Sequence, residues 1–144
     1  MRYEPRGPDT DCRVYPPFAR SVVHDDAGVT PYVLVVDDDR AFRGLTARII
    51  TALGLGEVVQ AGTFASALEA AGRLEPVAAL VDVGLPDGDG VELARRLAEA
   101  PWAPRVVLTS SDPDAATRAG AIPFVAKHDL VDVDLRLLLG GPEE

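Results

Sequence analysis

The sequence predicts an α/β protein in which a doubly wound, five-stranded parallel sheet carries helices on both faces. Two continuous apolar runs, YVLVV at residues 32–36 and AALVDV at residues 78–83, have the composition of strands that are covered on both sides. Segments with helical spacing alternate with five such strand-like runs. Because crossovers between parallel strands are right-handed, this alternation favours a doubly wound sheet.

Three further short segments complete the set of expected strands. EVVQA is a short strand-like run, and RVVLTSS ends in hydroxyl residues. PFVAK begins with Pro123, whose missing N–H is tolerated at the start of an edge strand. The expected strands are residues 32–36, 57–61, 78–83, 105–111 and 123–127.

The helices are expected between these strands. AFRGLTARIITALG places Phe42, Leu45, Ile49 and Leu53 at helical spacing, and Gly54 follows as a stop signal. Similar patterns occur after the second, third and fifth strands, but the segment after the fourth strand is short. The expected helices are residues 41–54, 64–74, 90–100 and 131–140, with a short helix or turn over 112–121.

Composition and charge narrow the class of protein. The 144 residues, 47% of them hydrophobic, suffice for one domain with a substantial core. The net charge of −9 argues against nucleic acid as a direct partner, because phosphate binding needs clustered Lys and Arg. The sequence shows no signal peptide or membrane span, and the lone Cys12 cannot form an internal disulfide. A soluble cytoplasmic protein without membrane contacts is expected.

The chain divides near residue 30. Residues 1–30 are rich in proline and charge and show no periodicity, which is typical of a flexible N-terminal arm, although a misassigned start codon would look the same. His24 in this arm is expected to be solvated. The folded domain is expected to cover residues 31–144.

Polar side chains stand where the expected strands end. In an open α/β sheet, ligands bind outside the carboxyl ends of the strands. Clustered carboxylates at that edge are costly unless a cation neutralises them, and Mg²⁺ takes carboxylate and phosphate oxygens as ligands. The polar residues at the strand ends are Asp37, Asp38, Asp39, Asp82, Thr109 and Lys127.

These groups suit phosphoryl transfer. An aspartate can act as the nucleophile and form an aspartyl phosphate. The transfer then depends on positioning and on neutralising the phosphoryl oxygens, which a hydroxyl and an ammonium can assist. Lys127 is the only lysine among fourteen basic residues, so the one compact ammonium of the chain stands at this edge.

With these motifs in order, residues 32–139 resemble the receiver domain of two-component response regulators, as in CheY-like proteins. The resemblance implies a flavodoxin-like strand order of 2-1-3-4-5 and a bound Mg²⁺. It also implies that Asp82 accepts the phosphoryl group, that the LPDGDG segment at residues 85–90 is the turn after the third strand, and that Thr109 and Phe124 form a switch. By the same resemblance the metal ligands are Asp37, Asp38, Asp82 and the Gly84 carbonyl, and the catalytic residues are Asp82, Thr109 and Lys127.

The sequence departs from the family pattern in three places. His128 follows Lys127 where the family usually has proline, and Ser110 stands where it usually has alanine. Lys127 follows Thr109 by 18 positions, which shortens the fourth helix by about one turn. That helix belongs to the face that receivers use for output, so the family's usual dimer geometry is in doubt and a weak homodimer stays an open option.

The resemblance implies a stand-alone receiver in a phosphorelay, or a fragment of a larger regulator. Its partners would be a sensor histidine kinase or phosphotransfer protein and an unidentified downstream protein. It would not be an enzyme beyond its own phosphorylation and dephosphorylation. A pseudo-receiver that acts only as an interaction module is the alternative. A haloacid-dehalogenase phosphatase is disfavoured, because the Asp-x-Asp-x-Thr run is missing after the first strand.

Several of these residues also have plain structural explanations. Asp38 or Asp39 can cap the first helix, and we expect Asp39 to do so. Asp87 and Asp89 suit a turn and a helix cap better than a metal site. Thr109 and Ser110 can bond to the backbone, Phe124 can be a core aromatic, His128 can be solvated, and Trp102 can pack under a surface loop.

Overall fold

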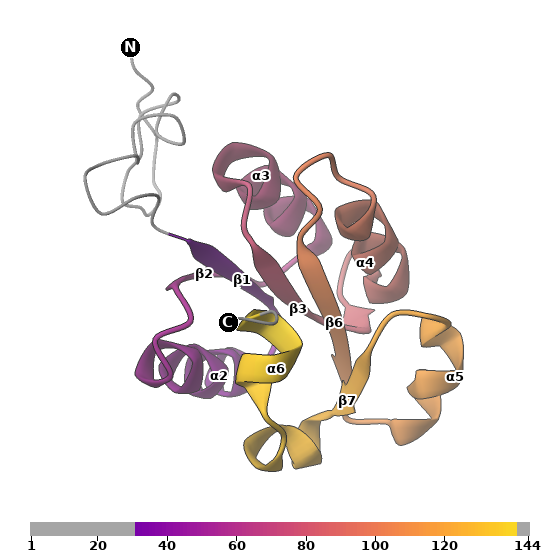
Figure 1. Cartoon of the computed structure of the whole chain (residues 1–144). Coiled ribbons are helices and arrows are strands. Elements are labelled where there is room, and N and C mark those ends of the chain that lie inside the picture. The colour runs from indigo at the N-terminus through magenta and orange to yellow at the C-terminus, as the bar shows by residue number, and fades with distance from the viewer. Residues whose placement is uncertain (1–30, 141–144) are drawn as a thin grey trace, which may run out of the picture. The chain divides into compact units, whose positions relative to one another are not determined.

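The structure is a computed structural model that describes residues 31–140; the arm expected at residues 1–30 and residues 141–144 lie outside the described residues. Five parallel strands form one sheet in the order β2-β1-β3-β6-β7, so the expected 2-1-3-4-5 order is confirmed (Figure 1). The strands are β1 (Tyr32–Val36), β2 (Glu57–Ala61), β3 (Ala78–Asp82), β6 (Arg105–Ser110) and β7 (Phe124–Ala126).

Helices cover both faces of this sheet (Figure 1). The faces are distinguished below by the helices that cover them: α2 and α6 lie on one, and α3, α4 and α5 on the other. The helices are α2 (Arg40–Ala52), α3 (Phe64–Leu74), α4 (Gly90–Ala98), α5 (Ala116–Ala119) and α6 (Leu135–Gly140), with 3₁₀ turns η1 (Pro113–Ala115) and η2 (Lys127–Asp132).

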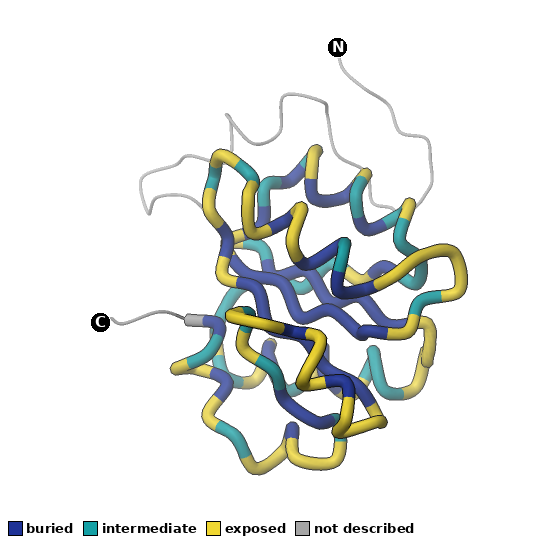
Figure 2. The backbone as a smooth tube through the Cα atoms, turned by 90° about the vertical axis from the view of Figure 1, so that its right-hand side faces the viewer, coloured by how far each residue is buried: buried dark blue, intermediate teal, exposed yellow. Residues whose placement is uncertain are grey.

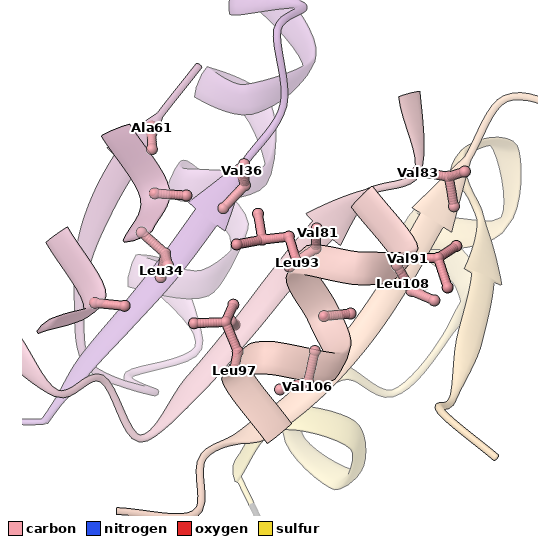
Figure 3. Close-up of a cluster of buried hydrophobic side chains, with 14 of the residues drawn as sticks. Leu34, Val36, Ala61, Val81, Val83, Val91, Leu93, Leu97, Val106 and Leu108 are labelled. Carbon is pink, nitrogen blue, oxygen red and sulfur yellow. The ribbon is translucent and has the colours of Figure 1, made fainter. Parts of the chain in front are cut away.

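The alternation of side chains along the strands builds a separate core on each face. Figure 2 shows the central strands as buried segments between more exposed helices and loops. The α2-face cluster joins alternate strand residues to residues of α2, η2 and α6. The strand residues are Val33, Val35, Ala78, Leu80, Val107 and Val125, and the others are Ile50, Leu130, Leu135 and Leu139. The α3-face cluster is larger, and Figure 3 shows Leu93 of α4 beside Val81 of β3. Continuous apolar runs are thus required, because both faces of each central strand are buried.

The helix between β6 and β7 is short, as expected. Only α5, of four residues, and the preceding turn η1 fill this connection. Asp112 starts it by accepting a hydrogen bond from the Asp114 N–H at 3.0 Å. The crossover therefore offers little more than one helical turn on the α3 face.

Two sequence expectations need correction. Leu45 was expected on the buried side of α2 but is 38% exposed, because the helix turns Thr46 and Ile50 inward. The last helix begins at Leu135 rather than at residue 131, since Asp134 accepts hydrogen bonds from the next turn and residues up to Asp132 form η2.

The LPDGDG segment contains the expected turn, at Pro86 and Asp87. The residues on either side of it, Gly84–Leu85 (β4) and Gly88–Asp89 (β5), pair as a small antiparallel hairpin. No helix within residues 31–140 has the length and apolarity needed to cross a bilayer.

Candidate functional site

The sheet alternation brings four polar side chains to one side of the strand ends. Each of them follows a member of the α2-face cluster by two positions, and residues two apart on a strand point to the same face. Asp82 and Thr109 are also directly opposite each other in the β3–β6 register. The pairs are Val35 and Asp37, Leu80 and Asp82, Val107 and Thr109, and Val125 and Lys127.

Three carboxylates converge at this edge. Asp37, Asp38 and Asp82 each offer a ligand oxygen, and these atoms lie within 4.8 Å of one another. Asp37 is 1% and Asp82 6% exposed, whereas Asp38 is open to solvent. Two nearly buried carboxylates thus lie beside a third that is exposed to solvent.

Lys127 lies between the two buried acids. Its Nζ is 2.8 Å from Asp37 Oδ2 and 3.3 Å from Asp82 Oδ2, and its side chain is only 16% exposed. The third neighbour of the ammonium is an aromatic face, because Nζ lies 4.8 Å from the centroid of the Phe42 ring. One positive charge therefore serves two carboxylates.

The pKa values of both Asp82 and Lys127 are raised in this cluster. Burial and the neighbouring Asp37 charge raise the pKa of Asp82 from its ordinary 3.8 to about 6, although Lys127 and the Gly84 N–H oppose the shift. Burial alone would lower the pKa of Lys127, but contact with Asp37 and the charges of both acids outweigh it and raise that pKa. The ammonium is thus firmly charged, while the acid pair lacks a full complement of positive charge.

The metal-free protein is expected to lose stability as the pH rises through about 6. Because the pKa of Asp82 is raised in the folded state, that state holds the proton longer than the unfolded chain does. The stabilisation is complete below about pH 4 and is lost above about pH 6. We expect the free energy of unfolding to fall by roughly 1–3 kcal/mol across this interval.

Urea unfolding in EDTA on both sides of this interval measures the effect. Asp82→Asn has no group to titrate at this position, so its free energy of unfolding should fall distinctly less. Equal falls in the wild type and the variant would show that Asp82 is not the group responsible.

The carboxylate cluster fits a hard divalent cation. Asp37 Oδ2 is buried and receives no aligned hydrogen bond from the described residues, although the Lys127 ammonium is close. Asp82 Oδ1 accepts only a long hydrogen bond of 3.3 Å from the Gly84 N–H. Carboxylate oxygens with spare lone pairs beside an exposed acid are the donor set that Mg²⁺ prefers, since it keeps several waters. Asp37, Asp38 and Asp82 can therefore hold it.

Comparison with known proteins decides the family. The family model described as the response regulator receiver domain matches residues 33–135. The chain belongs to the response regulator receiver family. One relative of this receiver domain is the KDP operon transcriptional regulatory protein KdpE of Escherichia coli (strain K12), which is 35% identical over 99 residues. The match covers 66% of this chain and 44% of KdpE, so the chain spans less than half the length of that relative.

Solved receivers share the fold of this domain. A putative response regulator from Chloroflexus aurantiacus superposes with a TM-score of 0.64 at 25% identity, over 77% of this chain and 98% of that chain. A response regulator protein from Burkholderia pseudomallei also has a TM-score of 0.64, at 27% identity, over 75% of this chain and 66% of that chain. Its structure contains a phosphorylated aspartic acid, a calcium ion and citrate.

The acidic run after β1 of the receiver domain has a divided role. Asp39 caps α2, as expected, by accepting hydrogen bonds from the N–H groups of Ala41 and Phe42 at 3.0 and 3.2 Å. Asp37 Oδ1 in turn accepts from the Asp39 N–H at 2.8 Å. The run thus fixes the start of α2 next to the carboxylate cluster. Phe42 was expected only as one of the apolar residues at helical spacing in this helix, but a first-turn residue at this edge of the sheet can also face the site.

The hairpin after β3 is anchored by two acids. Asp89 caps α4 by accepting from the Val91 N–H at 3.0 Å, as expected. Asp87 lies in the turn of the hairpin, as expected, and also reaches the start of α3, where it accepts from the N–H groups of Phe64 and Ala65 at 2.7 and 3.1 Å. The first of these bonds lowers the pKa of Asp87. No local pattern signals this contact, because 23 positions separate Asp87 from Phe64.

A further missed residue is Arg43, whose guanidinium donates to the Asp37 carbonyl at 2.6 Å and to the Gln60 side chain at 3.0 Å. It joins α2 to the ends of β1 and β2. An Arg one position after Phe42 lies in the first turns of the helix that leaves the site, and that location is the only sequence signal for it.

The remaining candidates divide between the site and the surrounding structure. Thr109 is buried at the end of β6, and the neighbouring Ser110 hydroxyl accepts from the Asp112 N–H at 3.0 Å. Phe124 packs against the α3-face cluster, so it lies on the other face from Val107 and Val125. A switch that links Phe124 to Thr109 would have to act around the end of β6.

Two surface expectations hold within the described part of the chain. His128 is solvated, with its side chain 68% exposed and its ring 3.5 Å from Asp129. Trp102 packs against the α3-face cluster and is partly buried. His24 and Cys12 belong to the segment outside the described residues.

Proposed function

We propose that this receiver domain accepts a phosphoryl group on Asp82 in a two-component phosphorelay. The observation that supports the proposal is the placement of Lys127 between two buried acids, Asp37 and Asp82, beside the exposed Asp38. Such a cluster is short of positive charge, and its raised Asp82 pKa is a property common at functional sites.

The roles of the residues follow from their chemistry. Asp37, Asp38, Asp82 and the Gly84 carbonyl would hold Mg²⁺, which when bound neutralises carboxylate and phosphoryl oxygens. An Asp82 oxygen forms the new bond to phosphorus. The phosphorus–nitrogen bond of a donor phosphohistidine breaks, and the electron pair leaves with the imidazole. Lys127 then binds the phosphoryl oxygens that replace its carboxylate contact.

The output would be a local switch. Thr109, opposite Asp82 in the sheet, would donate its hydroxyl hydrogen to the new phosphoryl group, and Phe124 would respond to that movement. The changed surface would be read by an unidentified downstream protein. The phosphoryl donor would be a sensor histidine kinase or a phosphotransfer protein, and no separate substrate would be turned over.

Two comparisons support this assignment. The Burkholderia pseudomallei neighbour contains a phosphorylated aspartic acid and a calcium ion, which are the modification and the class of cation proposed here. The KdpE relative carries the name of a transcriptional regulatory protein, a class in which a receiver serves a larger regulator.

Intact mass spectrometry tests the proposal without the cognate kinase. The wild type in acetyl phosphate and Mg²⁺ should gain about 80 Da, the mass of one phosphoryl group in place of hydrogen. EDTA should suppress the gain, because the carboxylates then lack the cation. A protein that gains no mass from acetyl phosphate, and that beryllofluoride does not alter, would instead support the pseudo-receiver alternative.

A further inference from the structure

The ring of Phe42 faces the Lys127 ammonium at the edge of the carboxylate cluster. Nζ forms an ion pair with Asp37 Oδ2 at 2.8 Å and donates a hydrogen bond to Asp82 Oδ2 at 3.3 Å, and the aromatic centroid lies 4.8 Å away. The partly buried ring also packs against the α2-face cluster. The ammonium is therefore enclosed by two anions and one aromatic face.

The position of this ring is fixed from both ends. The backbone N–H of Phe42 is bound by the Asp39 carboxylate at 3.2 Å, while the ring contacts the core. Asp39 is itself bound through its N–H to Asp37. A continuous set of contacts thus leads from an acid of the cluster, through the helix cap, to the ring that faces the lysine.

A lysine at such a site needs this support. Its side chain has four rotatable bonds and a strongly hydrated ammonium, so carboxylates alone allow several arrangements. An aromatic face attracts the cation through its quadrupole without supplying a competing hydrogen bond, and the attraction grows when water is excluded. The ring can therefore hold Nζ in place while leaving its N–H groups free for carboxylate or phosphoryl oxygens.

We propose that Phe42 is a positioning residue for Lys127: through a cation–π contact it holds the ammonium where Asp82 and an incoming phosphoryl group meet. This inference rests on the proposed function and extends it to a residue of α2 that touches neither the metal ligands' oxygens nor phosphorus. Its expected consequence is a slower phosphoryl transfer when the aromatic face is lost.

A lysine-specific NMR label gives a direct readout. Lys127 is the only lysine, so ¹³Cε-lysine labelling yields one side-chain signal that needs no assignment. In the wild type the attached protons should be shifted upfield by the ring current of Phe42. Phe42→Tyr should keep the shift, and Phe42→Leu and Phe42→Met should lose it. This measurement needs no phosphoryl donor, so its result is independent of whether Asp82 is modified.

Rates of mass gain at saturating acetyl phosphate and Mg²⁺ test the role itself. Phe42→Leu and Phe42→Met should react about three- to tenfold more slowly than the wild type, whereas Phe42→Tyr should restore most of the rate. Ile49→Ala is the control for lost packing, because Ile49 packs against the same cluster about two turns further along α2. It should react at the wild-type rate.

The outcomes separate the two claims. A wild type that is phosphorylated normally, with Phe42→Leu and Phe42→Met equally fast, would overturn the positioning role and leave the proposed function intact. Slow reaction in Phe42→Tyr and Ile49→Ala as well as in Phe42→Leu would show that packing, not the aromatic face, matters. An unmodified wild type with an upfield lysine signal would overturn the proposed function while confirming the contact.

Discussion

Asp82→Asn is expected to gain no mass under conditions in which the wild type gains about 80 Da. The amide that replaces the carboxylate carries no negative oxygen to attack phosphorus, so the rate should fall by more than about a hundredfold. The substitution keeps the shape of a buried side chain and removes an acid whose pKa is raised to about 6. The variant should therefore fold, and intact mass after acetyl phosphate and Mg²⁺ measures the loss.

A matched control separates this effect from a general loss of charge near the site. Asp112 is an exposed acid after β6 whose oxygen caps η1, and asparagine can also cap. Asp112→Asn should gain the same mass as the wild type. A gain of about 80 Da in Asp82→Asn at the wild-type rate would mean that another group, such as Asp37 or Asp38, is the acceptor.

Among glycine-to-alanine substitutions in the described part of this domain, Gly90→Ala is expected to be the most destabilising. A Cβ at this position would lie 1.9 Å from the Asp82 carbonyl oxygen and 2.7 Å from Val83 Cα, both of them backbone atoms. Neither can move freely, because the Gly90 N–H also bonds to the Val83 carbonyl at 2.8 Å. The close approach that glycine allows holds the start of α4 against the end of β3.

The expected cost is roughly 4 kcal/mol or more, which many small domains cannot sustain. Circular dichroism and urea unfolding would show a largely unfolded protein or a much lower midpoint. Because the start of α4 packs against the end of β3, where Asp82 lies, any folded fraction should also react slowly with acetyl phosphate.

Gly72→Ala provides the opposite expectation. Gly72 lies inside α3, is exposed, and has no atom within 4 Å of an added Cβ. Alanine should stabilise the protein there by about 0.5–1 kcal/mol, because it restricts the unfolded chain and favours the helix. If both substitutions changed stability equally, the packing explanation for Gly90 would be wrong.

The sequence predicted those parts of the fold that depend on local pattern. Apolar runs gave all five strands of the main sheet, and the caps at Asp39 and Asp89 were correctly expected from residue type and position. The boundary of α6 was missed, because the cap at Asp134 competes with the apolar pattern that begins earlier. Leu45 was misplaced because the helical spacing of apolar residues fits more than one rotation of α2.

Contacts between distant segments could not be predicted from pattern. The hydrogen bonds from the α3 N-terminus to Asp87 depend on how the β4–β5 hairpin folds back. The contact of Phe42 with Lys127 joins the first helix to the last strand of the sheet. In each case the two residues meet only because two elements pack together, and the sequence of neither element indicates the contact.

By itself the sequence determined the alternation of strands and helices, the presence of acids, a hydroxyl and one amine at the strand ends, and the resemblance to receivers, because these follow from local composition and order. Only the tertiary structure decided that one ammonium is shared by two buried carboxylates and faces an aromatic ring. Those distances depend on strand register and on the rotation of α2 against the sheet, which are set by the packing of side chains far apart in the chain.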